Sequence, residues 1–330
     1  MAFREAEHSP LPVPNGWYAV AFSKDVIKGA VQPIHYFGED MVLFRTRSGE
    51  ARVLDAFCPH LGAHLGEGGR VVGESVRCPF HGWQYDGVTG ACVQIPYCDT
   101  IPKAARLRAW DTQEKNGMIF VWYHAEQKPP LWDFPALPEF EDEDWSEPIC
   151  FELVIDVHVQ DMHENNNDPI HFNYVHGMVG GELPGELKYF DDPRHYQIVN
   201  HNETETQVGT FQTSLVRDSW GVGMTGVRLE GIPEAGMLLY SSTTPIELDP
   251  PRTISRWALT ATNNMIDYAG DDFLHRLMQG VEQDRGIWSN KVHRAKPLFC
   301  KADTYLIEFR KWVRQFYESD PAPLRAVGEE

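Results

Sequence analysis

Two short cysteine–histidine motifs constrain this chain more than any other feature of its sequence. The first, C-P-H, occupies positions 58–60, and the second, C-P-F-H, occupies positions 78–81 after a gap of seventeen residues. Each motif carries one Cys and one His, whereas zinc ribbons usually place two Cys in a motif. In a Rieske [2Fe–2S] centre two Cys hold one iron and two His hold the other. The motifs therefore predict such a centre, with the ligands Cys58, His60, Cys78 and His81.

The residues that flank the two motifs favour the same interpretation. Gly62 and Gly82 would let backbone N–H groups approach the cluster sulfurs closely, and Trp83 follows the second motif. Histidine ligands make the cluster less anionic and raise its reduction potential, so that it can accept electrons from an ordinary ferredoxin. The alternative is a zinc site or four unrelated core residues.

Composition limits the class of protein and its partners. With 330 residues, 42% of them hydrophobic, the chain can form two domains with sizeable cores. Its 48 acidic and 29 basic side chains give a formal charge of −19, which argues against nucleic acid and anionic membranes as partners. The first ten residues lack the apolar region of a signal peptide, and no uncharged apolar run approaches the length of a membrane span. We therefore predict no stable membrane insertion.

The remaining cysteines bear on the cellular compartment. They show no paired spacing and are Cys92, Cys98, Cys150 and Cys300. Unpaired thiols beside an iron–sulfur motif are typical of a reducing compartment. A cytoplasmic location is therefore predicted.

Strand and helix patterns divide the chain into three parts, and the predicted fold class is α+β. Residues 16–125 contain short apolar or alternating runs that predict an all-β Rieske [2Fe–2S] domain. Residues 126–150 are rich in Pro and acidic side chains and are predicted to be a linker. Residues 151–330 are predicted to form a helix-grip domain, in which a curved antiparallel sheet wraps a long helix at 271–291 and leaves a hydrophobic pocket. The strand candidates of this domain are residues 207–213, 227–231, 237–240 and 254–259.

A second pair of imidazoles occurs at His171 and His176. Pro169 suits the first turn of a helix, with Asp168 as its cap. Five positions along an ideal helix rotate the second side chain by about 140°, so the two His can share a metal only if the helix loosens or ends near His176. Gly177 follows, as a terminating residue would. Taken alone, the pair favours two structural histidines over a metal site.

A carboxylate on an apolar helix face offers a third ligand. Leu277, Val281 and Trp288 mark one face of the predicted helix at 271–291, and Asp284 falls on the same face. Burying a carboxylate is costly unless it is paired or bound to a metal. Asp284 is therefore either the partner of a nearby cation or a metal ligand. Two His and one carboxylate form the facial triad of non-haem Fe(II) oxygenases.

With these residues in place, the chain resembles the oxygenase (alpha) component of the Rieske non-haem iron oxygenases over nearly its whole length. The signature of that family, an acid followed by Asn-x-x-Asp-x-x-His-x-x-x-x-His, is met by residues 164–176. Residues 281–288 resemble the helix that supplies the carboxylate ligand. The resemblance is closest to the 3-ketosteroid 9α-hydroxylase and cholesterol 7-desaturase-like group.

The resemblance implies a role for each candidate residue. It makes His171, His176 and Asp284 the ligands of a mononuclear Fe(II), and Asn165 and Asp168 catalytic residues. Asp168 would hydrogen-bond an iron-bound His and a cluster His on the neighbouring subunit of a homotrimer, and that cluster His would be His81. Electrons would pass from the cluster to the mononuclear iron along this route.

The implied activity is that of a terminal monooxygenase in steroid metabolism. It would use O₂ to hydroxylate or desaturate an apolar, steroid-like small molecule. Its electrons would come from a ferredoxin or an NAD(P)H-dependent reductase, because the chain has no strand-linked G-x-G-x-x-G motif. One alternative is a Rieske oxygenase that acts on aromatic compounds, and another is a Rieske electron-transfer protein without catalysis. Residues 178–189 form either a lid over the site or an ordinary surface loop.

Overall fold

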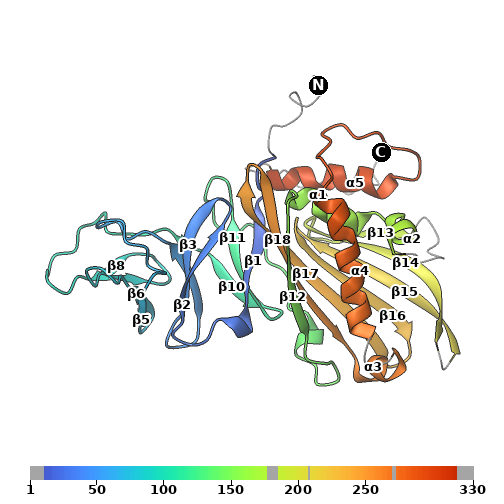
Figure 1. Ribbon diagram of the computed structural model, residues 1–330, viewed down its shortest axis with the longest axis horizontal. Coiled ribbons are helices and arrows are strands. Elements are labelled where there is room, and N and C mark those ends of the chain that lie inside the picture. The colour runs from blue at the N-terminus through green and yellow to red at the C-terminus, as the bar shows by residue number, and fades with distance from the viewer. Residues whose placement is uncertain (1–10, 177–184, 207–208, 270–272, 318–330) are drawn as a thin grey trace. The chain divides into compact units, whose positions relative to one another are not determined.

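The computed structural model describes residues 11–176, 185–206, 209–269 and 273–317 (Figure 1). The chain forms two compact units, and each has its own sheets and its own buried core. Residues 17–131 make up the first unit. The second unit contains the described residues from Trp132 onward together with residues 11–16.

The first unit is built from three sheets of short strands. One contains β1 (Gly16–Phe22), β11 (Met118–Tyr123) and β10 (Thr112–Lys115); the next contains β2 (Val31–Tyr36), β3 (Glu39–Arg45), β4 (Ala51–Asp55) and β9 (Ala109–Trp110); the last contains β5 (Arg70–Val72), β6 (Ser75–Arg77), β7 (Gln84–Asp86) and β8 (Cys92–Gln94). All residues of β1 are buried, so both faces of this strand are covered. Apart from the turn η1 (Ser23–Asp25), the described residues here confirm the predicted all-β fold.

The two cysteine–histidine motifs lie in loops of the first unit that share one core. The first motif lies between β4 and β5, and the second lies between β6 and β7. Below them Leu65, Val76 and Tyr85 are completely buried, in the same core cluster as Cys58 and Cys78. Because both loops pack on one rigid core, their ligand side chains are held in place by the strands at their bases.

The second unit is built on one seven-stranded antiparallel sheet. Its order is β12-β18-β17-β16-β15-β14-β13. The strands are β12 (Ile149–Ile155), β13 (Glu186–Tyr189), β14 (His195–Thr206), β15 (Gly209–Trp220), β16 (Met224–Ile232), β17 (Ala235–Leu248) and β18 (Pro251–Ala261). Strands β13 to β18 follow one another as a meander, and β12 pairs with the last of them.

The helix α4 (Phe273–Trp288) lies across one face of this sheet (Figure 1). Its residues Val281 and Trp288 pack with Ile155 and Met162 in a buried cluster. A long helix against a large antiparallel sheet confirms the predicted α+β fold. The other helical segments are η2 (Pro138–Phe140), α1 (Val159–His163), η3 (Glu164–Asn167), α2 (His171–Val175), α3 (Asn263–Ala269), α5 (Thr304–Trp312) and η4 (Val313–Tyr317).

The stretch predicted to be a linker, residues 126–150, is divided between the two units at Leu131. Beyond this point Phe134 and Leu137 are buried, and Glu139 pairs with Arg228 of β16. Proline removes hydrogen-bond donors but does not prevent the apolar side chains between prolines from packing. The second half of this stretch is therefore part of the folded second unit.

Several strands of the second unit extend beyond the predicted ones, whereas the helix predicted at 271–291 ends earlier, at Trp288. Positions 207–208 of a predicted strand and 271–272 of this helix lie outside the described residues. β15 continues to Trp220, and β18 begins at Pro251. The predicted strands were shorter because buried polar residues, such as Thr253 and Ser255 of β18, interrupt the hydrophobic alternation from which strands are predicted. The helix α5 was not predicted. Of the predicted lid, positions 178–184 lie outside the described residues, whereas Glu186–Tyr189 form β13. No helix in the described ranges is long and apolar enough to cross a membrane.

Candidate metal centres

The two cysteine–histidine motifs form matching loops. Cys58 N–H donates to the carbonyl five residues later at 2.9 Å, and Cys78 N–H does the same at 2.8 Å. In return, Gly62 N–H donates to the Cys58 carbonyl at 2.9 Å, and Gly82 N–H donates to the Cys78 carbonyl at 3.2 Å. Both glycines have a left-handed backbone, with φ of 76° and 75°, which a glycine adopts without strain. The predicted glycines therefore shape both loops.

The loops bring the two imidazoles together. The rings of His60 and His81 have centroids 4.7 Å apart, and His60 stacks on Trp83 at 4.6 Å. His60 Nδ1 is buried and has no hydrogen-bond partner among the described residues. Leaving a buried ring nitrogen unpaired is costly, and a metal ion would satisfy it.

The two thiols lie in the same core and form no disulfide. Burial raises the pKa of the Cys78 thiol, and the neighbouring Cys58 raises it further, although nearby backbone N–H groups oppose both effects. Cys58 Sγ lies 3.0 Å from Tyr85 Oη, a contact that was not predicted. A hydroxyl at a ligand sulfur can tune a metal centre. The donor set of two thiols and two imidazoles fits a [2Fe–2S] cluster.

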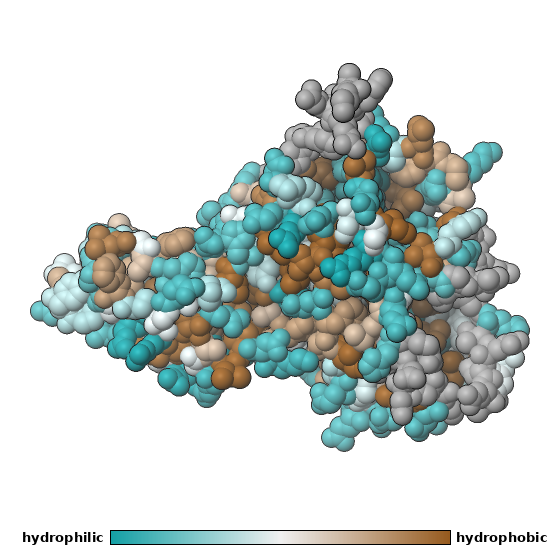
Figure 2. Space-filling view, viewed as in Figure 1, coloured by the Kyte–Doolittle hydropathy of each residue, from teal (hydrophilic) through white to brown (hydrophobic). Residues whose placement is uncertain are grey.

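The surface around the two motifs is partly apolar. The large exposed side chains there are Phe57, Leu61, Phe80 and Tyr97, which are 49%, 65%, 62% and 61% exposed. Figure 2 shows such apolar groups interspersed with polar ones on this part of the first unit.

In the second unit the structure brings His171, His176 and Asp284 together. One potential ligand atom from each lies within 4.8 Å of the others, and His176 Nε2 is 3.4 Å from Asp284 Oδ2. Two ligand atoms about 2.1 Å from a shared ion and at right angles are about 3 Å apart, so the observed spacing fits a metal site. The two imidazoles and the carboxylate are the donor set of a facial triad.

The short helix α2 explains how two His five positions apart converge. It ends at Val175, and His176 is its C-cap residue. The helix therefore does not continue far enough to turn the two rings apart. It begins at His171 and not at Pro169 as predicted, but Asp168 Oδ1 still accepts hydrogen bonds from the N–H groups of Ile170 and His171, at 2.9 and 3.3 Å.

Neighbouring side chains orient all three residues of the triad. Asn165 Nδ2 lies 3.1 Å from His171 Nε2 and 3.1 Å from Asp284 Oδ2. His176 Nδ1 lies 3.0 Å from Gln283 Oε1, so the ring donates there and turns Nε2 toward the triad. Gln283 precedes Asp284 in the chain, and its role was not predicted.

His171 is oriented by the backbone of Asp168. Its Nδ1 is bonded to the Asp168 carbonyl oxygen, which directs Nε2 toward the triad. The acceptor of this hydrogen bond is thus the main-chain carbonyl of Asp168, whereas the Asp168 carboxylate accepts a backbone N–H at the start of α2. The predicted contact of that carboxylate with His81 of a neighbouring subunit stays a prediction.

Burial shifts the pKa of two residues of the triad. It raises the pKa of the Asp284 carboxyl, although His171 and His176 oppose it, and it lowers the pKa of His171, although Asp284 opposes that shift. Asp284 is only 5% exposed. A metal site explains why this carboxylate lies on the apolar face of α4, because two imidazoles lie close enough to bind the same metal ion.

A cavity of about 420 Å³ opens beside the triad. Small-molecule sites commonly have volumes of about 300–1,000 Å³. Its walls include apolar side chains of α2, the sheet and α4, among them Phe172, Leu239, Trp257, Leu277 and Val281. None of the described residues that line it is Lys or Arg.

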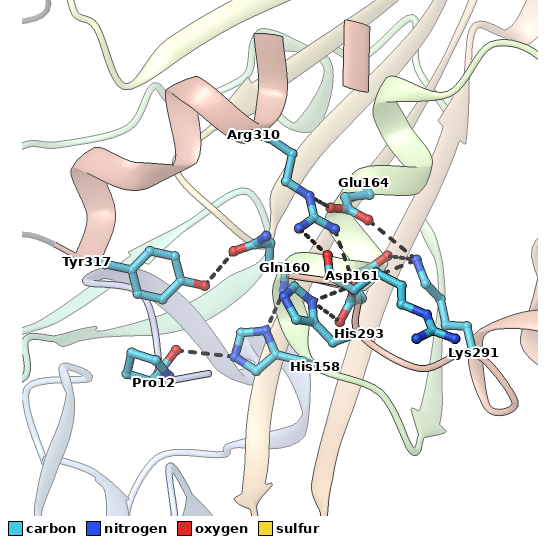
Figure 3. Close-up of polar contacts among 10 residues, drawn as sticks. Pro12, His158, Gln160, Asp161, Glu164, Lys291, His293, Arg310 and Tyr317 are labelled. Atoms are coloured by element: carbon cyan, nitrogen blue, oxygen red, sulfur yellow. Dashed lines mark hydrogen bonds and ion pairs between the residues drawn. The ribbon is translucent and has the colours of Figure 1, made fainter. Parts of the chain in front are cut away.

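An ionic network joins α1 and η3 to the C-terminal part of the chain (Figure 3). His293 Nδ1 lies 3.1 Å from both carboxylate oxygens of Asp161, and Lys291 Nζ donates to the Asp161 carbonyl at 3.1 Å. Glu164 pairs with Arg310 of α5 and, at 3.5 Å, with Lys291. Burial disfavours the ionised form of Asp161, but His293 and Lys291 outweigh it and keep its pKa lowered. The network ties the segment before α2 to the chain that follows α4.

His158 and His163, which repeat the spacing of the triad histidines, are structural. His158 Nδ1 accepts a hydrogen bond from Gln160 N–H at 3.2 Å, and its Nε2 donates to the Pro12 carbonyl at 3.2 Å (Figure 3). His163 Nδ1 accepts from Gly223 N–H at 3.0 Å. Burial lowers the pKa of His158 to about 4 and that of His163 to about 3. Both rings are therefore neutral parts of the core.

Comparison with known proteins agrees with this description of the two units. Residues 16–105 match the Rieske [2Fe-2S] domain, and residues 121–317 match the 3-ketosteroid 9alpha-hydroxylase C-terminal domain. The chain is 31% identical to cholesterol 7-desaturase nvd of Drosophila melanogaster, over 94% of this chain and 76% of that protein. It is 26% identical to the oxygenase component of 3-ketosteroid-9-alpha-monooxygenase of Rhodococcus rhodochrous, over 94% of this chain and 82% of that protein.

Solved structures share the fold at lower identity. The QL mutant of NdmA from Pseudomonas putida CBB5, solved with theobromine, is 19% identical with a TM-score of 0.75, over 91% of this chain and 89% of that chain. Dicamba monooxygenase bound to dicamba is 18% identical with a TM-score of 0.74, over 93% of this chain and 98% of that chain.

Proposed function

This chain belongs to the Rieske oxygenases with a 3-ketosteroid 9α-hydroxylase-type C-terminal domain, and we propose that it is the terminal oxygenase of a multicomponent monooxygenase. Its substrate is a neutral, apolar, steroid-like molecule that it hydroxylates or desaturates. Residues 16–125 serve as the cluster domain and 151–330 as the catalytic domain, and residues 126–150 link the two, with the part beyond Leu131 folded into the second unit.

The proposed substrate class rests on the charged side chains that line the cavity. Among the described residues that line it, Asp284 is an acid and none is Lys or Arg. An aromatic acid would place its carboxylate in this largely apolar space without a cationic side chain to pair with it, which is costly. A neutral sterol or steroid has no such charge, and the cavity walls match its apolar surface. The two relatives named for a sterol and a steroid support the same class.

Two groups of residues hold the metals in this proposal. Cys58, His60, Cys78 and His81 hold the [2Fe–2S] cluster, and His171, His176 and Asp284 hold a mononuclear Fe(II). When bound, this iron supplies open coordination positions at which O₂ is activated with electrons from the cluster. The chain's own contribution is to orient the ligands. Asn165, Gln283 and the Asp168 carbonyl direct each side chain toward the shared position.

The electrons have to come from a partner protein. No flavin or nicotinamide fingerprint occurs in the sequence, and the relative from Rhodococcus rhodochrous is itself named as an oxygenase component. A ferredoxin or an NAD(P)H-dependent reductase fits this role. Transfer between the two metal centres is proposed to pass from His81 to Asp168 across a subunit interface of a homotrimer. The proposed location is the cytoplasm.

Substrate-dependent O₂ consumption tests the proposal. The enzyme, supplied with a reductase and a ferredoxin, is presented with steroids and sterols and, in parallel, with aromatic acids. We expect O₂ uptake coupled to product only with the steroids and sterols. Uptake coupled to an aromatic acid assigns the chain to the aromatic class instead. A cluster that cycles through reduction and oxidation without coupled uptake for any substrate would indicate an electron-transfer protein.

A further inference from the structure

The floor of the cavity changes from apolar to hydroxyl-bearing side chains along the strands. On β17 the alternate residues Leu239, Ser241 and Thr243 face the cavity, because successive strand residues point to opposite sides. β16 repeats this order, with Val227 opposite Leu239 and Thr225 opposite Ser241. The floor thus has an apolar part and a polar part.

Thr225 and Ser241 form a hydroxyl pair with one unused proton. Their oxygens are 2.8 Å apart, and the residues are 8% and 3% exposed. Each hydroxyl has one donor proton, so one donates to the other and the second proton needs a different acceptor. Within the described part of the chain neither hydroxyl has another hydrogen-bond partner. The pair therefore offers a donor at a buried wall of the cavity.

In a neighbouring pair of hydroxyl residues, both donor protons have acceptors within the protein. Thr243 Oγ1 lies 2.9 Å from Ser255 Oγ and also donates to Met162 Sδ at 3.5 Å. Ser255 can donate to Thr243, and Thr243 to the sulfur, so both protons are used. Thr243 lines the same cavity as Thr225 but keeps no spare donor.

A second hydrogen-bond donor lies on the neighbouring strand, next to the hydroxyl pair. Trp257 of β18 is opposite Ser241 in the sheet, and its ring also lines the cavity. Its indole N–H is buried and has no partner among the described residues. By contrast, the amides of Gln279 and Gln283 are on exposed residues, where water competes for their hydrogen bonds.

We infer that the Thr225–Ser241 pair binds an oxygen acceptor of the substrate, a ketone or hydroxyl oxygen on an otherwise apolar, neutral molecule. The inference rests on the proposed function and extends it to the substrate's polar group. A buried, unpaired donor lowers the affinity for a ligand that lacks the acceptor, because the donor then remains unsatisfied. The pair thereby distinguishes an oxygenated substrate from the corresponding hydrocarbon and fixes which end of the molecule enters the polar part.

Binding of matched ligands tests this inference on the holoenzyme. The probes are the steroid hydrocarbon androstane with its monoketones, and an aromatic hydrocarbon with the corresponding ketone, ethylbenzene with acetophenone. We expect the wild type to bind the preferred ketone about tenfold more tightly than its hydrocarbon. In the double variant Thr225→Val/Ser241→Ala that ratio falls to nearly one. Thr225→Ser, which retains the hydroxyl, keeps the preference, and so does Thr243→Val.

The carbonyl stretching frequency of the bound ketone gives a readout that a loss of packing does not reproduce. A hydrogen bond to the carbonyl lowers this frequency, so we expect a shift in the wild type, Thr225→Ser and Thr243→Val but none in the double variant. An unshifted carbonyl in the wild type overturns the inference, as does a shift that disappears only in Thr243→Val.

The two kinds of probe separate this inference from the proposed function. Tighter binding of the aromatic ketone, with the preference removed by the double variant, rejects the steroid substrate but supports the hydroxyl pair. Binding of steroids with equal affinity for ketone and hydrocarbon keeps the proposed function and rejects the pair.

Discussion

Asn165 and Asp284, which are 119 positions apart in the chain, are joined by a hydrogen bond of 3.1 Å from the Asn165 amide to Asp284 Oδ2. Asn165 belongs to η3 and Asp284 to α4, so this contact sets the distance between the two segments that supply the triad. The same amide lies 3.1 Å from His171 Nε2. One side chain therefore contacts both an imidazole and the carboxylate of the triad.

Replacing Asn165 should weaken metal binding without unfolding the protein. Asn165→Leu keeps a similar volume but removes the donor, so we expect affinity for Fe(II) at the mononuclear site to fall by about 10–100-fold. Titration of the iron-depleted site with Fe(II) measures this change. Asn173→Leu, at an exposed position of α2, is the control and should bind as the wild type does. Equal affinities in both variants would show that Asn165 does not orient the ligands.

Removing the Asp284 carboxylate should abolish the mononuclear iron site and leave the cluster in place. In Asp284→Ala we expect iron to fall from about three to about two atoms per chain, because the cluster holds two. The visible spectrum of the cluster should persist, since its ligands come from the other unit. Iron content per chain and the visible spectrum are the measurements, with Glu282→Ala at an exposed neighbouring position as control. Unchanged iron content would remove Asp284 from the site.

Asp168→Asn should retain both centres and lose turnover. An Asn oxygen can still accept the N–H groups of Ile170 and His171, and the Asp168 carbonyl that orients His171 is unaltered. The carboxylate proposed to link His81 to the mononuclear site becomes a neutral amide, so we expect turnover to fall by about 100-fold. Metal content and single-turnover oxidation of the reduced cluster are measured together. Rapid oxidation in this variant would contradict the proposed route.

The parts of the site that depend on local sequence could be predicted from it. The glycines after each cysteine and the end of α2 near His176 are properties of a few consecutive residues. Asp284 could be noticed because a carboxylate interrupts an apolar helix face. In each case the signal lies within one turn or one helix.

Contacts between distant segments could not be predicted. Arg310 and Glu164 meet across 146 positions, and nothing in either local sequence indicates the partner. Thr225 and Ser241 are adjacent only because of the register between β16 and β17. In single strands these hydroxyl residues look like interruptions of the hydrophobic pattern, which is also why the predicted strands were too short.

The ionic network should contribute to stability much more than a surface pair does. Arg310→Met leaves Glu164 and Asp161 with one cation fewer, and both carboxylates are mostly buried. Breaking a buried pair costs about 3–5 kcal/mol, and we expect about 2–4 kcal/mol because Lys291 still contacts both acids.

The adjacent residue offers a matched control for this change. Lys311 pairs with Glu308 on the exposed side of the same helix, so Lys311→Met should cost less than about 1 kcal/mol. Thermal unfolding midpoints of the two variants compare them under the same conditions. Similar midpoints for both would show that the buried network adds no more stability than the surface pair.

The pH dependence of stability should report the buried neutral imidazole of His158. Burial lowers its pKa in the folded state to about 4, whereas an unfolded His has a pKa of about 6.5. As the pH falls below about 6.5 the unfolded state therefore binds the proton first, and stability is lost progressively until the folded state is protonated near pH 4. From pH 7 to 5.5 this loss amounts to about 1 kcal/mol for one such residue. His158→Gln cannot titrate, so its unfolding midpoint should fall less over this interval than that of the wild type. Parallel midpoints over the whole range would mean that His158 has the same pKa in both states.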